Sequence, residues 1–126
     1  MALTSAQAAL DKKAQGVIIL DLRQFTFITD YFVIGSGHSD VHVRAIADGI
    51  VESLGKKQVK VWHREGDEEG TWILLDYGDI VVHIFYEPAR QFYSLERLWA
   101  DAPQLPMEEE TGEEVTGPIE NMEQEK

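Results

Sequence analysis

The stretch TWILLDYGDIVVHIFY, residues 71–86, predicts a β-hairpin, and with it a sheet at the centre of the fold. Gly78 and Asp79 suit a two-residue turn, because glycine adopts a positive φ angle without steric penalty. Side chains alternate between the two faces of a strand, so the turn also sets which residues lie together. One face then holds only apolar or aromatic pairs, which we expect to be buried: Tyr77 with Ile80, Leu75 with Val82, and Ile73 with Ile84.

The opposite face of the hairpin is mixed, since it pairs Asp76 with Val81, Leu74 with His83, and Trp72 with Phe85. Two acids beside a histidine resemble a catalytic group on paper. However, no serine, cysteine or threonine stands beside them as an activated nucleophile, and the second acid lies in the turn, where aspartate is favoured. We therefore interpret these residues as structural. The mixed face is then either buried within the domain or partly covered by another protein.

Outside the hairpin, hydrophobic periodicity predicts helices at 4–15, 39–55 and 88–100, and strands at 17–22, 30–37 and 58–63. Thr4 or Ser5 is expected to cap the first helix and Ser39 the second, because a side-chain oxygen can accept from a free N–H of the first turn. Pro88 suits the first turn of the last helix. The apolar stripe of that helix consists of Ala89, Phe92, Leu95 and Trp99.

The order of these elements predicts the α/β class, with a mixed sheet of about five strands and helices packed on it. A chain of 126 residues with 44% hydrophobic content fits one domain. We expect the domain to span residues 1–103 and an acidic tail to span 104–126, with disorder beyond Pro106. The charge supports this division, because residues 101–126 contain nine Asp or Glu and one Lys, within a net charge of −12.

Composition also excludes several classes of function. No Lys/Arg cluster provides the basic surface that phosphate contacts need, so we expect no direct reading of nucleic acid. The apolar runs are too short to cross a membrane, and the N-terminus lacks the long apolar run of a signal peptide. The chain has no cysteine, which excludes a thiolate nucleophile or metal site. We therefore expect a soluble, intracellular protein, for which a basic protein partner is electrostatically more plausible than nucleic acid.

Two other motifs contain residue types that could form a site. GSGHSD, residues 35–40, joins a strand to a helix, where phosphate can bind, and a Gly-Ser pair at such a place is typical of nucleotidyltransferases. The next predicted strand, QVKVWH, has no carboxylate to hold the metal ions of that chemistry. His38 and His42 are four residues apart, but a cap at Ser39 leaves the first of them outside the helix. We therefore predict no cofactor, no metal and no catalytic residue.

Three motifs together resemble the ribosomal silencing factor family, also called Iojap. They are DYFVIGSGHSDVHVRAIADGI, then EGxxxGTWILLDYGDIVVHIF, then YSLERLWADAP. The resemblance runs from about Leu10 to Pro103 in the order of the family. It implies a fold related to nucleotidyltransferases but without the catalytic site, hence no enzyme. The acidic tail is longer than many members carry.

The resemblance also implies a function. Members bind the large ribosomal subunit through its protein fourteen, block joining of the small subunit, and lower translation when nutrients are scarce. They are often homodimers off the ribosome. The family tryptophan at the ribosomal-protein contact corresponds to Trp72, and the neighbouring LLDYGD motif extends the expected contact to Leu74, Asp76 and Tyr77. Two alternatives stay open: a nucleotide-transferring enzyme with unusual ligands, and a dimeric adaptor for another basic protein.

Overall fold

The computed structural model of the chain describes residues 1–106. The helices and strands follow the order predicted from the sequence, except that the last helix is divided in two. The elements are α1 (Ala2–Asp11), β1 (Gln15–Asp21), β2 (Tyr31–Gly37), α2 (Asp40–Lys56), β3 (His63–Glu65), β4 (Trp72–Asp76), β5 (Ile80–Tyr86), α3 (Glu87–Tyr93) and α4 (Leu95–Leu98).

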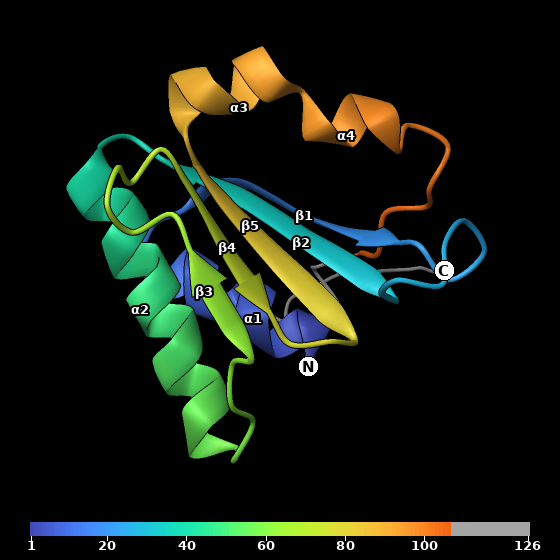
Figure 1. The fold of residues 1–126 in the computed structure, drawn as a ribbon, viewed down its shortest axis with the longest axis horizontal. Coiled ribbons are helices and arrows are strands. Elements are labelled where there is room, and N and C mark those ends of the chain that lie inside the picture. The colour runs from blue at the N-terminus through green and yellow to red at the C-terminus, as the bar shows by residue number, and fades with distance from the viewer. Residues whose placement is uncertain (107–126) are drawn as a thin grey trace, which may run out of the picture.

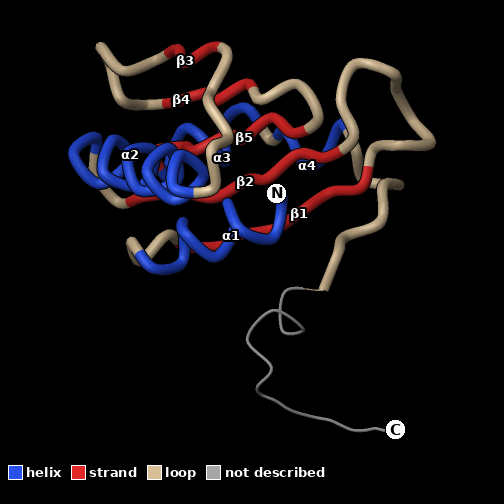
Figure 2. Tube along the Cα trace, turned by 90° about the horizontal axis from the view of Figure 1, so that it is seen from below, coloured by secondary structure: helices blue, strands red, loops and turns tan. Residues whose placement is uncertain are grey.

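The five strands form one mixed sheet in the order β1-β2-β5-β4-β3, which Figure 2 shows from one edge to the other. β2 and β5 are parallel, and the remaining neighbours are antiparallel. β2 and β5 lie side by side although α2, β3 and β4 separate them along the chain, because a parallel pair requires a long crossover connection. The predicted mixed sheet with packed helices is confirmed.

The helices cover the two faces of the sheet unequally (Figure 1). α1 and α2 lie on one face, over a large core that includes Ile46, Ile50, Ile73 and Ile84. α3 and α4 lie on the other face, over a smaller cluster built around Phe85. Neither α3 nor α4 contains a fully buried residue, so their hold on the sheet is weaker than that of α1 and α2. In residues 1–106, no helix is long and apolar enough to cross a membrane.

The predicted hairpin register is confirmed at every pair within the ladder. Ile73 lies opposite Ile84, Leu75 opposite Val82, and Trp72 opposite Phe85. The turn closes with a hydrogen bond from the Tyr77 N–H to the Ile80 carbonyl over 2.9 Å, and Gly78 has the expected positive φ angle of 88°. The apolar face of the hairpin is buried, as predicted. Its members are Ile73, Leu75, Tyr77, Ile80, Val82 and Ile84.

The second helix also agrees with its sequence pattern. The Ser39 hydroxyl accepts a hydrogen bond from the backbone N–H of His42 over 3.0 Å, as a cap at this position requires. The predicted apolar stripe is fully buried and consists of Val43, Ile46, Ala47, Ile50 and Leu54. Local sequence signals were sufficient for this helix because its cap and its apolar stripe agree with each other.

The strand predicted at 58–63 is wrong. Residues 58–61 lie outside any strand, and pairing with β4 begins only when the Trp62 N–H donates to the Asp76 carbonyl over 2.9 Å. The chain first turns back from α2: Gln58 has a φ angle of 66°, and the Val59 N–H bonds to the Leu54 carbonyl. Val59 and Val61 do pack against the core. Their alternation therefore reflects contact with the core and not membership of a strand.

The continuous helix predicted at 88–100 is also wrong, because Ser94 interrupts it with left-handed φ and ψ angles of 49°. Its hydroxyl donates to the Gln91 carbonyl over 2.7 Å, which stabilises the break locally. Ala89, Leu95 and Trp99 pack on the sheet as expected, but Phe92, which lies in α3 before the break, is 81% exposed. A serine carries little propensity for this conformation, so the break had no clear sequence signal.

The two ends of the domain differ from the prediction in detail. α1 begins at Ala2 without a side-chain cap and ends at Asp11, so neither Thr4 nor Ser5 caps it. At the other end, Gln104 forms a bridge with Leu20 on β1, although the sequence placed residue 104 in the tail. The free edge of β1 is thereby partly covered. The predicted disorder beyond Pro106 lies outside the described residues.

Candidate functional site

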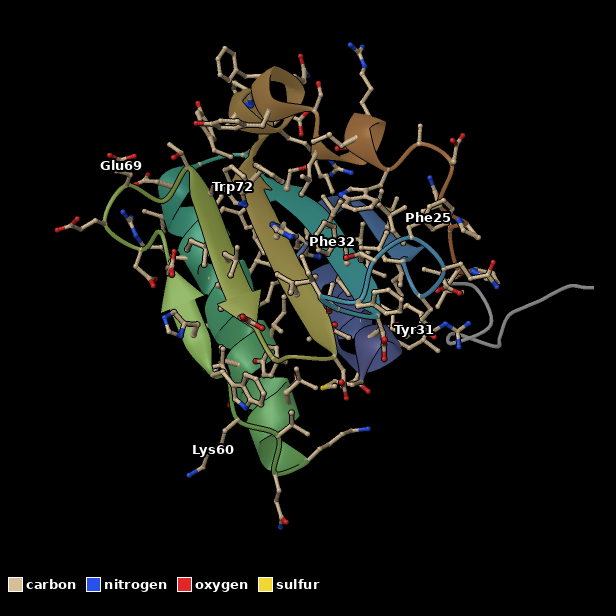
Figure 3. All side chains as sticks on the ribbon, turned by 45° about the vertical axis from the view of Figure 1, so that its right-hand side comes forward. Phe25, Tyr31, Phe32, Lys60, Glu69 and Trp72 are labelled. Atoms are coloured by element: carbon tan, nitrogen blue, oxygen red, sulfur yellow. The ribbon has the colours of Figure 1, made fainter. Side chains whose placement is uncertain are left out.

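The mixed face of β4 carries three of the four residues expected at the partner contact. Trp72, Leu74 and Asp76 alternate along the strand, and all three are partly exposed. Figure 3 shows Trp72 beneath α3, with Glu69 in the loop beside it. The structure therefore brings these three onto one surface, which we call the Trp72 surface: Trp72, Leu74 and Asp76.

Tyr77, the fourth expected residue, is placed differently. It belongs to the large core under α1 and α2, and only 6% of it is exposed. Burial raises the pKa of its hydroxyl, which has no hydrogen-bond partner among residues 1–106. Tyr77 therefore has little surface to offer a partner in the free protein. It follows Asp76 directly in the chain, but its side chain lies in the core on the opposite face of the sheet.

Trp72 is held on three sides. Its indole ring packs against Phe85 and Tyr93, at centroid distances of 4.9 and 4.8 Å. Its indole N–H donates to Nδ1 of His83 over 3.1 Å. A tryptophan that is partly exposed and yet well fixed loses little conformational entropy on binding, which is typical of interface anchors.

Asp76 is partly exposed, and its carboxylate also stabilises the hairpin turn. Its carboxylate Oδ1 accepts from the Gly78 N–H over 2.8 Å and so stabilises the turn. The sequence pattern predicted such a local role for Asp79, and in the structure it belongs to Asp76. The Asp79 backbone carbonyl instead accepts from the N–H groups of Asp30 and Tyr31, which ties the turn to the start of β2.

An acidic loop, residues 65–70, borders the Trp72 surface. Arg44 on α2 fixes this loop through its backbone, donating to the Asp67 carbonyl over 2.7 Å and to the Glu68 carbonyl over 2.9 Å. Gly66 has a φ angle of 99°, and a Cβ there would collide with the Trp72 carbonyl. The loop can therefore pass against β4 only because residue 66 is glycine.

The four acids of this loop differ in how they are paired: Asp67 has a close internal ion pair, Glu65 lies 3.9 Å from the ring of His63, and Glu68 and Glu69 have no partner among the described residues. Asp67 forms a bidentate pair with Arg64, at 2.8 and 2.6 Å, and hydrogen bonds from that guanidinium lower the pKa of the Asp67 carboxyl. The side chains of Glu68 and Glu69 are exposed and make no hydrogen bond or ion pair with any described residue. Their carboxylates are therefore available to a positively charged partner.

A shallow groove of about 430 Å³ lies between the acidic loop and the aromatic residues Trp72 and Tyr93. One wall carries Glu68 and Glu69 and the other is aromatic; Arg64 also lines the groove, but its charge is paired with Asp67 and Asp48. This combination suits a lysine or arginine side chain, because a carboxylate attracts its charge and an aromatic ring accepts its apolar stem or its cationic head.

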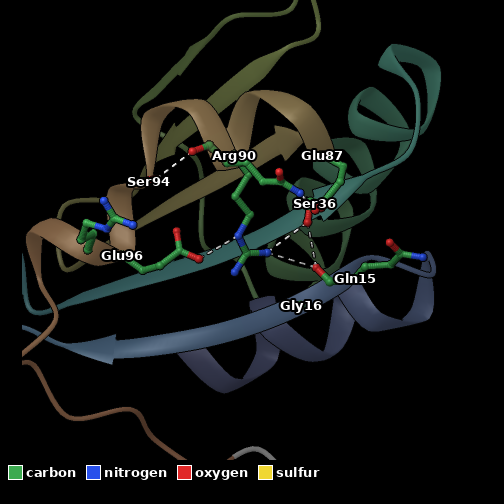
Figure 4. A pocket seen from close by; sticks show the side chains of 9 residues that line it. Gln15, Gly16, Ser36, Glu87, Arg90, Ser94 and Glu96 are labelled. Atoms are coloured by element: carbon green, nitrogen blue, oxygen red, sulfur yellow. Dashed lines mark hydrogen bonds and ion pairs between the residues drawn. The ribbon is translucent and has the colours of Figure 1, made fainter.

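The Gly-Ser motif that suggested nucleotide chemistry lies in a different cleft, of about 670 Å³, at the ends of β1 and β2. Ser36 is buried, and its hydroxyl donates to the Gln15 carbonyl over 3.1 Å. Arg90 of α3 donates to the same hydroxyl over 3.0 Å and to Glu96 of α4 over 3.0 Å (Figure 4). Ser36 is thus engaged in fastening α3 and α4 to the sheet.

His38 and His42 also have structural partners. Nδ1 of His42 accepts from the His38 N–H over 3.1 Å, and its Nε2 lies 2.8 Å from the Lys12 carbonyl. Both ring nitrogens of His42 are thereby engaged. In the described part of the chain, no group of three or more His, Asp or Glu side chains is arranged to hold a metal ion.

The whole chain, residues 1–126, matches the family described as "Ribosomal silencing factor during starvation" (RsfS). The chain belongs to the RsfS family. It is 41% identical over 99 residues to a ribosomal silencing factor of Bacillus subtilis (strain 168), an alignment that covers 79% of this chain and 84% of that relative. A chloroplastic Iojap protein of Arabidopsis thaliana is 34% identical over 113 residues, covering 87% of this chain and 47% of the plant protein.

Crystal structures of two similar proteins show the same fold. One, from Chromobacterium violaceum, has a TM-score of 0.76 and 32% identity, with 82% of this chain and 84% of that chain covered. The other, from Bacillus halodurans, has a TM-score of 0.72 and 34% identity, with 82% and 93% covered. The resemblance to the ribosomal silencing factor family that the sequence motifs indicated is therefore confirmed.

Three features around the Trp72 surface were not predicted from the sequence: the contact of Tyr93, the acidic loop, and the anchoring of that loop by Arg44. Tyr93 contacts Trp72 from α3. Arg44 fixes the acidic loop from α2. The cluster of acids next to an aromatic residue at 67–72 was a usable signal. The contact of Tyr93 had no such signal in the sequence, because it depends on how the distant helix α3 packs.

Proposed function

We propose that this RsfS-family protein represses translation by binding the large ribosomal subunit through ribosomal protein fourteen and blocking the small subunit from joining. Membership of a family described by ribosomal silencing during starvation supports the general role. The specific partner and the steric block rest on the resemblance of the Trp72 region to the family contact. The observation that carries the proposal is the placement of Trp72, partly exposed and firmly packed, on an otherwise mixed face.

The charge around this surface supports a basic partner. Glu68 and Glu69 stand beside Trp72, and Asp76 lies further along the same strand. A protein that binds ribosomal RNA carries many Lys and Arg residues, and acids at the rim of an interface speed its association. The contact we propose therefore consists of an aromatic centre at Trp72 and Leu74 with an acidic rim.

We further propose that the protein acts without catalysis. The Ser36 hydroxyl, which a transferase would need for its phosphate substrate, is occupied by Gln15 and Arg90. The regulatory description of the family supports the same conclusion. The cytoplasmic location and the homodimer off the ribosome stay predictions of the family resemblance.

The decisive experiment compares Trp72→Ala with Phe27→Ala, which removes a fully exposed aromatic side chain from the loop between β1 and β2. Both variants are tested for sedimentation with purified large subunits and for inhibition of subunit joining. We expect Trp72→Ala to weaken binding by about 2 kcal/mol or more. Because Trp72 is half-packed, we also expect it to lose roughly 1–3 kcal/mol of folding stability, less than a fully buried aromatic would.

The control variant should bind and inhibit as the unmodified protein does. If Trp72→Ala, folded at the assay temperature, still binds large subunits and blocks joining at the same concentration, the Trp72 surface is not the contact. If the unmodified protein does not sediment with large subunits, the adaptor alternative replaces the ribosomal one. A nucleotide-binding assay with magnesium tests the enzymatic alternative separately.

A further inference from the structure

The hydrogen bond between Trp72 and His83 fixes the protonation of the histidine ring. Indole N–H groups only donate, so Nδ1 of His83, 3.1 Å away, must carry its lone pair. The proton of the neutral ring therefore resides on Nε2. The two residues lie diagonally across the β4–β5 ladder, because His83 pairs with Leu74 and Trp72 pairs with Phe85.

His83 is built into the sheet and is not available to a partner. Only 4% of the residue is exposed, and the ring of Phe32 packs against it at a centroid distance of 4.4 Å. Its Nε2 has no hydrogen-bond partner among residues 1–106. Burial lowers the pKa of His83 to about 4, so the ring is neutral and can accept from Trp72 throughout the physiological range.

The remaining contacts of Trp72 are less directional. Phe85 and Tyr93 confine the plane of the indole, at interplanar angles of 31° and 48°, but aromatic packing allows a ring to slide or to flip end for end. A hydrogen bond to the indole N–H distinguishes between these orientations. Among the described residues, His83 is the one that accepts from this N–H.

We propose that His83 is a positioning residue for partner binding: through Nδ1 it holds the Trp72 indole in the single orientation that the partner recognises. This inference rests on the proposed function, because it requires Trp72 to be part of the contact. His83 itself does not touch the partner. It acts by lowering the number of orientations that Trp72 would otherwise have to give up on binding.

The test uses two replacements of nearly the same shape. His83→Asn places its Oδ1 close to the position of the histidine Nδ1, so it retains an acceptor for the indole N–H. His83→Leu has the same branching without an acceptor. Both remove the ring that packs on Phe32, so any difference between them reports the acceptor. Sedimentation with purified large ribosomal subunits measures binding, and thermal unfolding confirms that each variant is folded.

We expect His83→Leu to bind about five- to tenfold more weakly than His83→Asn, the effect of one net hydrogen bond. In a Trp72→Phe background, which keeps an aromatic ring but removes the N–H, the difference between the two should disappear. Equal binding of His83→Asn and His83→Leu in the Trp72 protein would overturn the inference, whether both bind well or both bind poorly, because the acceptor would then be irrelevant.

A measurement on the free protein tests the hydrogen bond independently of the ribosome. The indole N–H resonance of Trp72 is identified by its loss in Trp72→Phe. It should move upfield in His83→Leu and stay near its original position in His83→Asn. An unchanged resonance in His83→Leu would also overturn the inference. A Trp72→Ala variant that binds normally would instead contradict the proposed contact, so failure of the two ideas can be told apart.

Discussion

The guanidinium of Arg44 on α2 donates to the backbone carbonyl of Asp67, 2.7 Å away in the acidic loop. A second nitrogen of the same group reaches the Glu68 carbonyl, and a third pairs with Asp40. One side chain thereby joins the well-packed helix to the loop that carries the free acids. The shape of this loop is set from α2, a segment that does not itself lie on the Trp72 surface.

Replacing Arg44 should therefore loosen the acidic loop. Arg44→Met keeps most of the aliphatic stem but removes all three sets of bonds, and we expect a loss of about 1–3 kcal/mol in unfolding free energy. Arg44→Lys keeps the charge but lacks the planar fork, so it should recover less than half of that loss. Hydrogen exchange at residues 66–70 should rise in both variants. Unchanged exchange there would mean that Gly66 and the Arg64–Asp67 pair suffice to order the loop.

Asp76 allows charge to be separated from turn geometry. Asp76→Asn retains the Oδ1 that accepts from the Gly78 N–H over 2.8 Å, so stability should stay within about 0.5 kcal/mol. Asp76→Ala removes that acceptor and should lose about 1 kcal/mol. If the charge faces a basic partner, both variants should bind large subunits about threefold or more weakly at low salt, with a smaller effect at high salt. Normal binding by Asp76→Asn would assign Asp76 to the turn alone.

The buried His83 predicts a dependence of stability on pH. Its pKa is about 4 in the folded protein and near 6.5 when unfolded, so the unfolded chain binds more protons between these values. Stability should therefore fall as the pH decreases from about 6.5 to 4, by roughly 3 kcal/mol from this residue. Denaturant titrations across this range should show a flatter profile for His83→Asn. An identical profile in the unmodified protein and in His83→Asn would contradict the buried neutral ring.

Two truncations test where the domain ends. The composition of residues 107–126 offers few apolar side chains, so deleting them should leave the melting temperature nearly unchanged. Deleting 103–126 also removes the bond from the Asp21 N–H to the Pro103 carbonyl, the bond from the Leu105 N–H to Ile19, and the packing of Leu105. We expect that longer deletion to lose about 2 kcal/mol, which lowers the melting temperature by roughly 8 °C or more. Equal melting temperatures would place the end of the domain at residue 102.

The sequence by itself determined the hairpin and the second helix. In the hairpin, alternation with period two and a glycine turn admit a single register that buries the apolar face, and that register is observed from Trp72 to Phe85. In α2, the cap at Ser39 and the apolar stripe from Val43 to Leu54 are local signals that indicate the same helix. Family motifs added the identity of Trp72 as a candidate contact, which physical periodicity alone does not distinguish from a core residue.

Tertiary structure decided the features that depend on contacts between distant segments. β2 lies beside β5, Arg90 fastens α3 to Ser36, and Tyr93 reaches Trp72, although none of these partners is close in sequence. The same is true of Val59, whose apolar side chain found the core without entering a strand. The hydrophobic periodicity of a segment indicates only which face of that helix or strand is apolar. Which surface covers that side is decided by competition among all the segments that can bury it, and this competition is resolved only when the whole chain packs.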